Sequence, residues 1–449
     1  MTSVFHFGIL FAVGAIAGCN VADAQPSGSE IAAADPGTAE VSASALLSSN
    51  GPMCSTSAPR TVPPNDELRR ILTASTIRVE EAVCDARVPP GFNEPNGDIN
   101  LFPDKCATYT KGLPHDNFGR ADPTAFGSFI RALKTGRFED FEKIVLGGVR
   151  TLNNPMSALV YDLEGLDPAQ FGAPLVPPAP TVTSDQCATE LLEHYWASLL
   201  RDVPFSEYPT NALAILAAQE LGSQPTYLGP RDADGNVTPN LLFRGNFSGE
   251  RLGPYVSQFA VQPTFMGSQP ITQRQVTFAP GIDFDTTYSD WLSVQNGNYP
   301  APRLQYDSEL RFRRDGRDFA AWTHTDVLYQ AYLTAALVLF SNHTPYNPGN
   351  PYVRSRTQNG FSTFGESDIT VTLAEVATRT LNVSWYQKWL VHLRPRPEHV
   401  GGLVHLIKTG QENRTDCRFS NVILDSQGLE RSFTKYGTWL LSQAYPEGS

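Results

Sequence analysis

The side chains best suited to chemistry lie in the stretch KWLVHLRPRPE, Lys388 to Glu398, which holds three cations, one histidine and two prolines in eleven residues. The helix expected before it is too apolar for a surface helix, so we predict that it is buried. The two prolines stop a helix and push the residues before them, Arg394 and Arg396, toward extended backbone angles. Lys388 is therefore expected to project from the last turns of a helix, and Arg396 from its stiff exit.

Two cations held in this way can converge on one tetrahedral oxyanion, because lysine supplies a point charge and arginine a planar fork that matches phosphate-like oxygens. A simpler interpretation is that cations at a helix C-terminus stabilise the helix dipole. The surrounding bulk of Trp385, Tyr386 and Trp389, and the lack of a nearby run of Asp or Glu, favour an anionic ligand. We predict an anion-binding corner formed by Lys388 and Arg396.

The histidines of this region are open to two interpretations. His392 follows Lys388 by one helical turn, so it either lines the same pocket or is a hydrogen-bonded core residue. The spacing of His392, His399 and His405 does not match the usual zinc patterns, so we predict no metal site. The stretch Asp232-Ala-Asp-Gly lacks the flanking acids of a calcium loop and is typical of a turn. The chain has no Gly-x-Ser-x-Gly elbow, His-Glu-x-x-His motif or Walker loop.

The elements that must position this corner are mostly helices. Apolar periodicity and capping residues predict helices at 66–88, 123–137, 184–200 (capped by Ser184), 210–221, 319–340 and 366–393. The run 319–340 is apolar on nearly every face, which predicts a buried helix. Residues 222–316 favour long loops and a few short strands. The sequence therefore predicts one mostly α-helical domain, 66–449, built as a helical bundle with long insertions.

The first residues are typical of an export signal, expected at 1–24. An apolar run at 7–17 is followed by small residues, which allow either cleavage after Ala24 or lipidation of Cys19. Residues 25–65 are rich in Ala, Ser, Gly and Pro and predict a flexible leader. No segment reaches about 18 uninterrupted apolar residues. We expect an exported chain (secreted, periplasmic or lipid-anchored) that does not span a membrane.

The net charge argues against one class of function, and the cysteines indicate which covalent links to expect. The formal net charge of -12 argues against nucleic-acid binding, which requires a strong basic patch. Beyond Cys19 there are five cysteines, which an exported chain tends to pair as disulfides. Cys84 can pair with Cys54 or Cys106. An odd number leaves one free thiol or a partner outside this chain.

The corner also resembles a known family. Lys388, followed after seven residues by Arg396-Pro-Glu and then by Gly401-Gly402, resembles the first vanadate-binding motif of vanadium-dependent haloperoxidases, with the algal bromoperoxidase branch most similar. Five further stretches resemble that branch in the same order: Tyr109-Thr-Lys-Gly-Leu-Pro-His-Asp, Leu242-Phe-Arg-Gly, Gly253-Pro-Tyr-Val-Ser-Gln, Arg317-Asp-Phe-Ala-Ala-Trp and Glu375-Val-Ala-Thr-Arg. The resemblance covers roughly residues 66 to 449.

The resemblance implies a vanadate cofactor in a helical bundle of the haloperoxidase and type 2 acid phosphatase kind. It implies that hydrogen peroxide oxidises a halide, bromide in this branch, to a hypohalous-acid equivalent that reacts with an organic acceptor. Lys388 would bind a vanadate oxygen and polarise the bound peroxide, and Arg396 would neutralise a second oxygen. His392 and Arg394 would line the pocket. By the same resemblance, we expect a homo-oligomer.

The chain departs from the family pattern in one respect. The second motif is a Pro-small-Gly-His turn and the third contains Ser-Arg followed by Gly and His, the last His being the direct vanadium ligand. None of the eight histidines here follows a glycine. We therefore expect a C-terminally incomplete chain with an incomplete second bundle, inactive as it stands. The alternatives are an acid phosphatase of the same superfamily and an inactive truncated pseudoenzyme.

Overall fold

The computed structural model describes residues 67–87, 93–172, 177–246, 249–298, 304–325 and 327–448. The expected export signal (1–24) and leader (25–65) lie outside these residues. The chain divides into two compact units, Met1–Arg87 and Val88–Ser449. In the first unit the structure describes helix α2 (Glu67–Asp85), where a helix is predicted at 66–88. Across the described ranges, no helix is long and apolar enough to cross a membrane.

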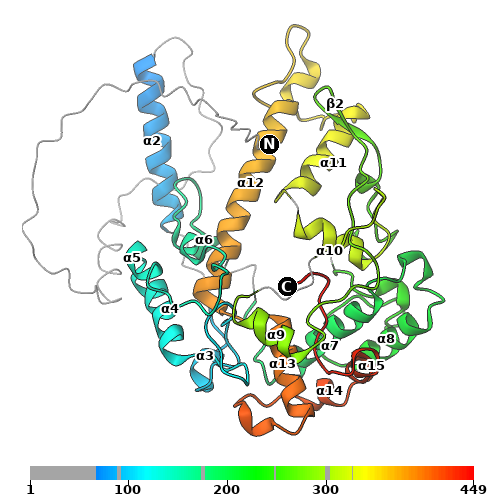
Figure 1. Cartoon of the computed structure of the whole chain (residues 1–449). Coiled ribbons are helices and arrows are strands. Elements are labelled where there is room, and N and C mark those ends of the chain that lie inside the picture. The colour runs from blue at the N-terminus through cyan, green and yellow to red at the C-terminus, as the bar shows by residue number, and fades with distance from the viewer. Residues whose placement is uncertain are drawn as a thin grey trace, which may run out of the picture. The chain divides into compact units, whose positions relative to one another are not determined.

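Most of the regular secondary structure of the second unit is helical (Figure 1), which confirms the predicted mostly α-helical fold. In chain order they are α3 (Asp98–Leu101), α4 (Pro123–Thr135), α5 (Phe138–Phe141), α6 (Pro168–Gly172), α7 (Asp185–Leu200), α8 (Ala212–Ser223), α9 (Tyr288–Gln295), α10 (Gly316–His324), α11 (Gln330–Ser341), α12 (Glu366–Tyr386), α13 (Pro397–Lys408), α14 (Asn421–Leu424) and α15 (Gln427–Tyr436). Short 3-10 turns connect several of them.

Helix starts are set by side-chain caps. Asp122 accepts a hydrogen bond from the Ala125 amide at 2.8 Å, with Pro123 in the first helical position of α4. Ser184 caps α7 by accepting from the Cys187 amide, as predicted. Such caps satisfy amides that have no partner within the helix. The helix predicted at 210–221 begins at Ala212, because Asn211 is its cap.

The main core lies where α7, α8, α13 and α15 meet. Leu192 and Trp196 of α7, Leu221 of α8, Val404 of α13 and Leu429 of α15 are fully buried in one cluster. Burying each such side chain stabilises the fold by roughly 1.5–3 kcal/mol. This cluster fixes α13, whose first residue follows Arg396 directly.

A second, smaller core forms between α4 and the end of the long helix α12. Phe129 of α4 packs edge-to-face on Trp389, with ring centroids 5.9 Å apart, and Leu113 and Leu393 join the same cluster. Trp389 is fully buried. Because it is the neighbour of Lys388 in sequence, its burial fixes the backbone that carries the predicted anion-binding lysine.

Strands are few and short, as predicted for residues 222–316. Strands β1 (Thr264–Met266) and β2 (Gln269–Ile271) pair antiparallel, with Phe265 opposite Pro270. In the described part of this region, the other pairing consists of isolated bridges, Gln275 with Arg311, Phe278 with Tyr306 and Phe284 with Gln443. These loops are held by side-chain hydrogen bonds more than by sheet.

The prediction of one buried helix over 319–340 is wrong. The segment forms two helices, α10 and α11, and Val327, Leu328 and Tyr332 are exposed. In α11 only Thr334, Ala336 and Val338 are buried. Helix α12 has no buried residue, although its apolar composition suggested burial. Composition indicates that a helix has apolar faces, but it does not show which of these faces pack against other elements.

A disulfide joins Cys106 to Cys417 across 311 residues of sequence. Both cysteines lie in the main core, so the bond ties the start of the second unit to the segment after α13. The pairing excludes Cys106 as the partner of Cys84, which is itself disulfide-bonded. Among the described cysteines, Cys187 is the one with a free thiol.

Candidate functional site

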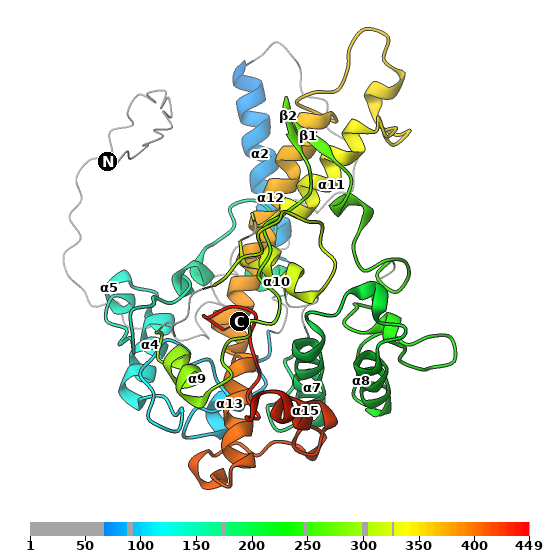
Figure 2. The same cartoon turned by 45° about the vertical axis from the view of Figure 1, so that its right-hand side comes forward.

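The corner begins where α12 widens into a π-helical turn at Gln387–His392. The Leu393 amide donates to the Lys388 carbonyl at 3.1 Å, and Leu393 itself adopts a left-handed backbone with φ 42° and ψ 39°. Arg396 is extended at φ -68° and ψ 147°, and α13 starts at Pro397. The predicted helix end and stiff extended exit are thus present (Figure 2), and they direct the chain from α12 into α13.

A second segment, residues 109–112, is bonded directly to this corner. The Tyr109 amide donates to the Leu393 carbonyl at 2.6 Å, and the Tyr109 ring contacts Trp389 edge-on at 4.8 Å. On its other side, the Gly112 amide donates to the Gln295 carbonyl at 2.8 Å. The loop that carries Lys111 is therefore held between the corner and the end of α9.

These segments enclose a cavity of about 490 Å³. Its lining includes four cationic side chains, Lys111, Arg150, Lys388 and Arg396, and one carboxylate, Glu447. The cations come from three places in the sequence, Lys111, Arg150 and the stretch 388–396, which the fold brings together. A concave surface with this many positive charges favours a small anion.

Lys388 has an unusual environment for a lysine. Its Nζ lies 4.5 Å from the ring centre of Trp389, 5.2 Å from Trp385 and 5.8 Å from Tyr109. Burial, followed by the positive charges of Arg396 and Lys111, lowers the pKa of Lys388 to about 8. No carboxylate of the described residues forms an ion pair with it. The charge of Lys388 is thus opposed by two cations and stabilised by aromatic rings.

Glu398 is a buried carboxylate that contacts two of the neighbouring cations. Its side chain is fully buried, and its Oε1 accepts from Lys111 Nζ at 2.7 Å and lies 4.0 Å from Arg396 Nε. Lys111 Nζ also donates to the Glu447 carbonyl at 2.6 Å. Arg150 pairs with the Glu447 carboxylate at 3.0 Å. Lys111 and Arg396 are therefore near neighbours on one buried carboxylate.

Asp285 is a further buried acid beside this group. It is 1% exposed, and neither carboxylate oxygen has a hydrogen-bond partner among the described residues. Burial, with the nearby charge of Glu398, raises the pKa of Asp285 to about 8, so its neutral form predominates at pH 7. A Cβ at Gly448 would lie 3.0 Å from Lys111 Nζ and 3.1 Å from Asp285 Oδ2. With a φ of +67°, this position suits glycine alone.

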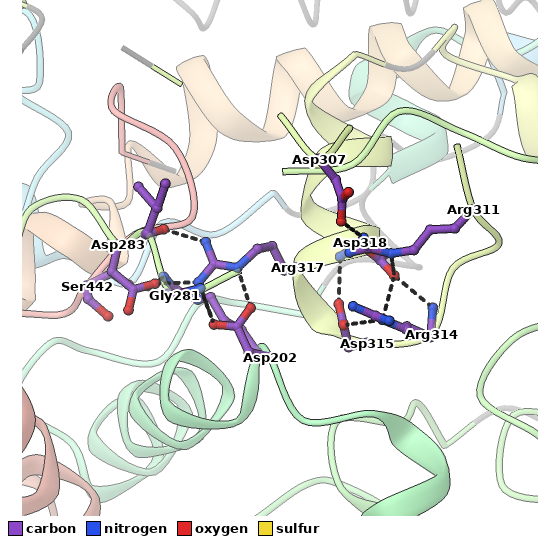
Figure 3. Close-up of polar contacts among 12 residues, drawn as sticks. Asp202, Gly281, Asp283, Asp307, Arg311, Arg314, Asp315, Arg317, Asp318 and Ser442 are labelled. Atoms are coloured by element: carbon purple, nitrogen blue, oxygen red, sulfur yellow. Dashed lines mark hydrogen bonds and ion pairs between the residues drawn. The ribbon is translucent and has the colours of Figure 1, made fainter. Parts of the chain in front are cut away.

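The segment that carries Glu447 and Gly448 is anchored by a buried ion-pair network (Figure 3). Arg317, at the start of α10, binds Asp202 through two nitrogens and Asp283 at 2.7 Å. Arg201 binds Asp283 at 2.7 Å and the Ser442 carbonyl at 2.5 Å. Burial alone would raise the pKa of Asp283, but Arg201 and its other partners hold it far below its usual range.

The anchored segment then runs beside the end of the 281–285 loop. Phe284 and Gln443 exchange two backbone hydrogen bonds, at 2.9 Å and 2.8 Å. This bridge leads the chain toward the cavity, where Glu447 and Gly448 form part of the wall. The network therefore positions one side of the cavity, although none of its arginines lines it.

Two of the sequence-predicted residues meet at the cavity and two do not line it. Lys388 and Arg396 are in its wall. Arg394 instead donates to Glu190 at 2.5 Å and contacts the Cys187 sulfur at 3.7 Å. Both ring nitrogens of His392 are buried and have no partner among the described residues. The described residues contain no group of three or more His, Cys, Asp or Glu that could hold a metal ion.

Sequence reasoning missed Lys111, Arg150, Glu398 and Asp285 as members of this site. Lys111 lies in one of the stretches that carry the family resemblance, but no spacing rule links it to Lys388. Its contact with Glu398 spans 287 residues of sequence. Glu398 follows Arg396 closely. One indication of its role was available from the sequence: a glutamate beside two prolines at a helix start is unexpected in a core.

A larger hollow of about 1220 Å³ elsewhere in the second unit is also lined by arginines. Arg231 and Arg244 each donate three hydrogen bonds to backbone carbonyls there. Arg244 also stacks on Tyr255 at 3.9 Å. These arginines hold loops together, so the smaller cavity at Lys388 is the better candidate for anion chemistry.

The fold and this cavity define a helical protein with a preorganised anion site. Solved structures agree: the homohexameric second vanadate-dependent bromoperoxidase of Ascophyllum nodosum superposes with a TM-score of 0.79 and 29% sequence identity, covering 89% of this chain and 68% of that one. No protein-family model matches the chain.

Comparison with curated proteins shows the family of this chain. A vanadium-dependent bromoperoxidase of Ascophyllum nodosum is 34% identical over 377 residues, 79% of this chain and 65% of the relative. One from Corallina officinalis is 32% identical over 436 residues, 79% of this chain and 72% of the relative. One from Corallina pilulifera is 33% identical over 382 residues, and the chain spans 63% of its length. The chain belongs to the vanadium-dependent haloperoxidase family.

Proposed function

We propose that this chain binds vanadate in the cavity at Lys388 and Arg396, and that the protein it forms oxidises bromide with hydrogen peroxide. The observation that carries the proposal is the charge of Lys388, which lies in a cationic cavity without a carboxylate partner among the described residues. The named activity of the relatives supports vanadate as the anion.

The residues present fit a tetrahedral oxyanion. Lys388 offers a point charge from the π turn, and Arg396 offers a planar fork from the extended exit. Both backbones are fixed, because Trp389 is buried and α13 is anchored in the main core. Donors held in place before the ligand arrives cost little reorganisation when charge develops.

When bound, vanadate supplies the centre at which hydrogen peroxide is activated. The chain's own contribution is electrostatic: Lys388 holds a proton and a positive charge at Nζ, and Arg396 holds a second charge. The rings of Trp385, Trp389 and Tyr109 shield Lys388 from water. In the overall reaction a halide ion, hydrogen peroxide and a proton give hypohalous acid and water.

Bromination of a dimedone-type reporter tests the proposal. A full-length form that also carries the second and third motifs of the family should halogenate the reporter only when vanadate, peroxide and bromide are all present. In that form Lys388→Ala should lower the rate by at least about a hundredfold. Lys143→Ala, at an exposed lysine of the second unit, serves as the control. Hydrolysis of nitrophenyl phosphate without halide or peroxide would favour the acid phosphatase alternative instead.

The 449 residues by themselves contain no histidine preceded by glycine. We therefore expect this chain alone to bind vanadate without halogenating, because the motifs that hold the vanadium-ligating and acid–base histidines of the family have no copy in it. Halogenation by the 449-residue chain would show that other residues supply these roles. We also propose that residues 1–24 are an export signal. The exported protein is then secreted, released into the periplasm or anchored by a lipid at Cys19.

The proposal includes self-association. Val371 and Val376 of α12 and Tyr332 of α11 are all exposed, although their helices are rich in apolar residues. Helices α11 and α12 contact each other, and exposed apolar side chains on neighbouring helices are candidates for an interface. A second copy of the chain is the proposed occupant, supported by the homohexameric assembly of the solved relative.

A further inference from the structure

A separate cavity of about 250 Å³ lies between α10, α11 and the loop at 255–260. None of the residues that line it lines the cavity at Lys388. Aromatic side chains form much of its wall: Tyr255, Phe259, Phe319, Trp322 and Tyr332. A mostly apolar cavity of this size suits an organic molecule about as large as one substituted benzene ring.

Arg313 is the one charged side chain among the residues that line this cavity, and it is 7% exposed. Its Nη1 donates to Gln275 Oε1 and its Nη2 donates to the Ala260 carbonyl, both at 2.7 Å. Its guanidinium also lies 5.1 Å from the ring centre of Trp322. Neutral groups therefore hold the guanidinium in place at the cavity, while its Nε has no hydrogen-bond partner among the described residues.

Arg313 also differs from the neighbouring arginines in its electrostatic partners. Arg311 and Arg317 each pair with a buried aspartate, at 2.8 Å and 2.7 Å, whereas no carboxylate of the described residues forms an ion pair with Arg313. Burial lowers the pKa of Arg313, and Asp318, which is already bonded to Arg311, offsets this only in part. Because a buried arginine is usually accompanied by an anion, a carboxylate on a ligand would supply the missing partner.

We propose that this cavity is a binding site for a small aromatic carboxylate. The ring of the ligand packs among the aromatic side chains, and its carboxylate pairs with Arg313, whose planar guanidinium matches carboxylate geometry. The proposal does not depend on vanadate binding, because the two cavities share no lining residue. A simpler interpretation is that Arg313 only ties the loop at 255–260 to Gln275, which predicts no preference for a charged ligand.

Titration with para-fluorobenzoate at pH 7, followed by fluorine NMR, separates these interpretations. The 449-residue chain should bind this probe with a dissociation constant of about 1 mM or below. Para-fluorobenzyl alcohol keeps the ring without the charge, and trifluoroacetate keeps the carboxylate without the ring. Each should bind at least about tenfold more weakly. Equal affinities for para-fluorobenzoate and the alcohol would overturn the proposal.

Substitutions in the cavity locate the binding site. Arg313→Met should weaken para-fluorobenzoate at least about tenfold. Because this change also frees the Ala260 carbonyl, Ala335→Trp provides a second test: it fills the cavity from α11, keeps Arg313 and should abolish binding. Arg274→Met is the matched control, since Arg274 lies over Phe312 outside the cavity, and its affinity should stay within about twofold of wild type. Wild-type affinity in both cavity variants would contradict the proposal.

The cavity at Lys388 is the competing site for any anionic probe. Sulfate, a tetrahedral anion whose charge does not change near neutral pH, serves as the competitor for that cavity. Saturating sulfate and Lys388→Ala should each leave the affinity for para-fluorobenzoate within about twofold of its value. Displacement by sulfate, with Arg313→Met binding normally, would place the probe in the other cavity and overturn the proposal.

Tyr332 belongs both to this cavity and to the surface proposed for self-association. A second copy of the chain is therefore the alternative occupant. If a second copy filled the cavity, the affinity for para-fluorobenzoate would fall as the protein concentration rises, and that result would also overturn the proposal. We expect an affinity that does not change with protein concentration.

Discussion

At the scale of single residues, the site is explained by the surroundings of Lys388 and by the buried carboxylate of Glu398. Lys388 is surrounded by aromatic rings and opposed by two cations, while Glu398 supports Lys111 and Arg396 from the core. Lysine and arginine are seldom withdrawn from water unless an anion accompanies them. An anion bound beside Lys388 would offset the positive charges that lower its pKa, and the donors would already be in place.

The lowered pKa of Lys388 gives a pH dependence with a defined sign. The cationic form of a lysine is lost as pH rises through its pKa, here about 8 in the ligand-free protein. Sulfate affinity should be steady between about pH 6.5 and 7.5 and fall above pH 8, by up to about tenfold per pH unit. Calorimetric titrations across this range measure it.

Lys388→Arg is the matched variant for this profile, because arginine keeps its charge throughout the range. Its sulfate affinity should fall less between pH 7 and 10 than that of the wild-type protein, with the remaining fall due to ionisation of Asp285, whose pKa of about 8 lies in the same range. A wild-type profile no steeper than that of the variant would show that Lys388 does not contribute its charge to the bound anion.

At the scale of elements, the site depends on how separate segments are brought to one cavity. The Arg317 network fixes the 281–285 loop and, through Arg201, the Ser442 carbonyl. The segment beyond Ser442 supplies Glu447 and Gly448 to the cavity wall. An ion-pair network that lines no part of the site therefore sets the position of one wall.

Arg317→Ala should destabilise the second unit strongly, by about 3–5 kcal/mol, because it removes the arginine that pairs with Asp202 and leaves the buried Asp283 with one cation fewer. Arg314→Ala is the control: this neighbouring arginine is 50% exposed and pairs with Asp315 and Asp318. Its loss should cost about 1 kcal/mol or less. Urea denaturation curves measure both, and similar losses for the two variants would contradict the assigned role of the network.

Local features of the fold could be predicted from sequence. Ser184 caps α7 as expected, and the prolines at 395 and 397 end one helix and begin the next. These features depend on residues a few positions apart, because the backbone preferences of such residues determine the local conformation directly. The same reasoning placed Lys388 and Arg396 on opposite sides of one turn.

Features that depend on distant contacts could not be predicted. Lys111 meets Glu398 across 287 residues, and Cys106 meets Cys417 across 311. Neither partner carries a local mark of the contact. The burial of α12 was wrongly expected for a related reason, since a sequence shows that a helix is apolar but not whether its partner belongs to the same chain.

At the scale of the whole molecule, the exposed apolar residues of α11 and α12 are expected to form an interface between copies. The paired change Val371→Asp and Val376→Asp should convert an oligomer to a smaller species, because it places charges in a desolvated contact. Sedimentation velocity measures the change. Leu252→Asp, at a leucine that is 83% exposed and far from α12 in sequence, should leave the mass unchanged.

A monomeric wild-type protein at micromolar concentration would contradict the proposed interface. So would an oligomer that both sets of substitutions leave intact, since the contact would then lie elsewhere. Because α12 runs directly into the turn that carries Lys388, an interface on this helix would also help to hold the anion site in place.

The central claim is that Lys388 and Arg396 form a vanadate site, and vanadate binding to the 449-residue chain tests it most directly. Trp385 and Trp389 lie beside Lys388, so quenching of their fluorescence reports binding. We predict saturable binding of one vanadate per chain, competed by phosphate. Lys388→Ala with Arg396→Ala should weaken it at least about a hundredfold, from loss of two charge-assisted contacts. Unchanged binding in this double variant, or no binding by the wild-type chain, would contradict the account.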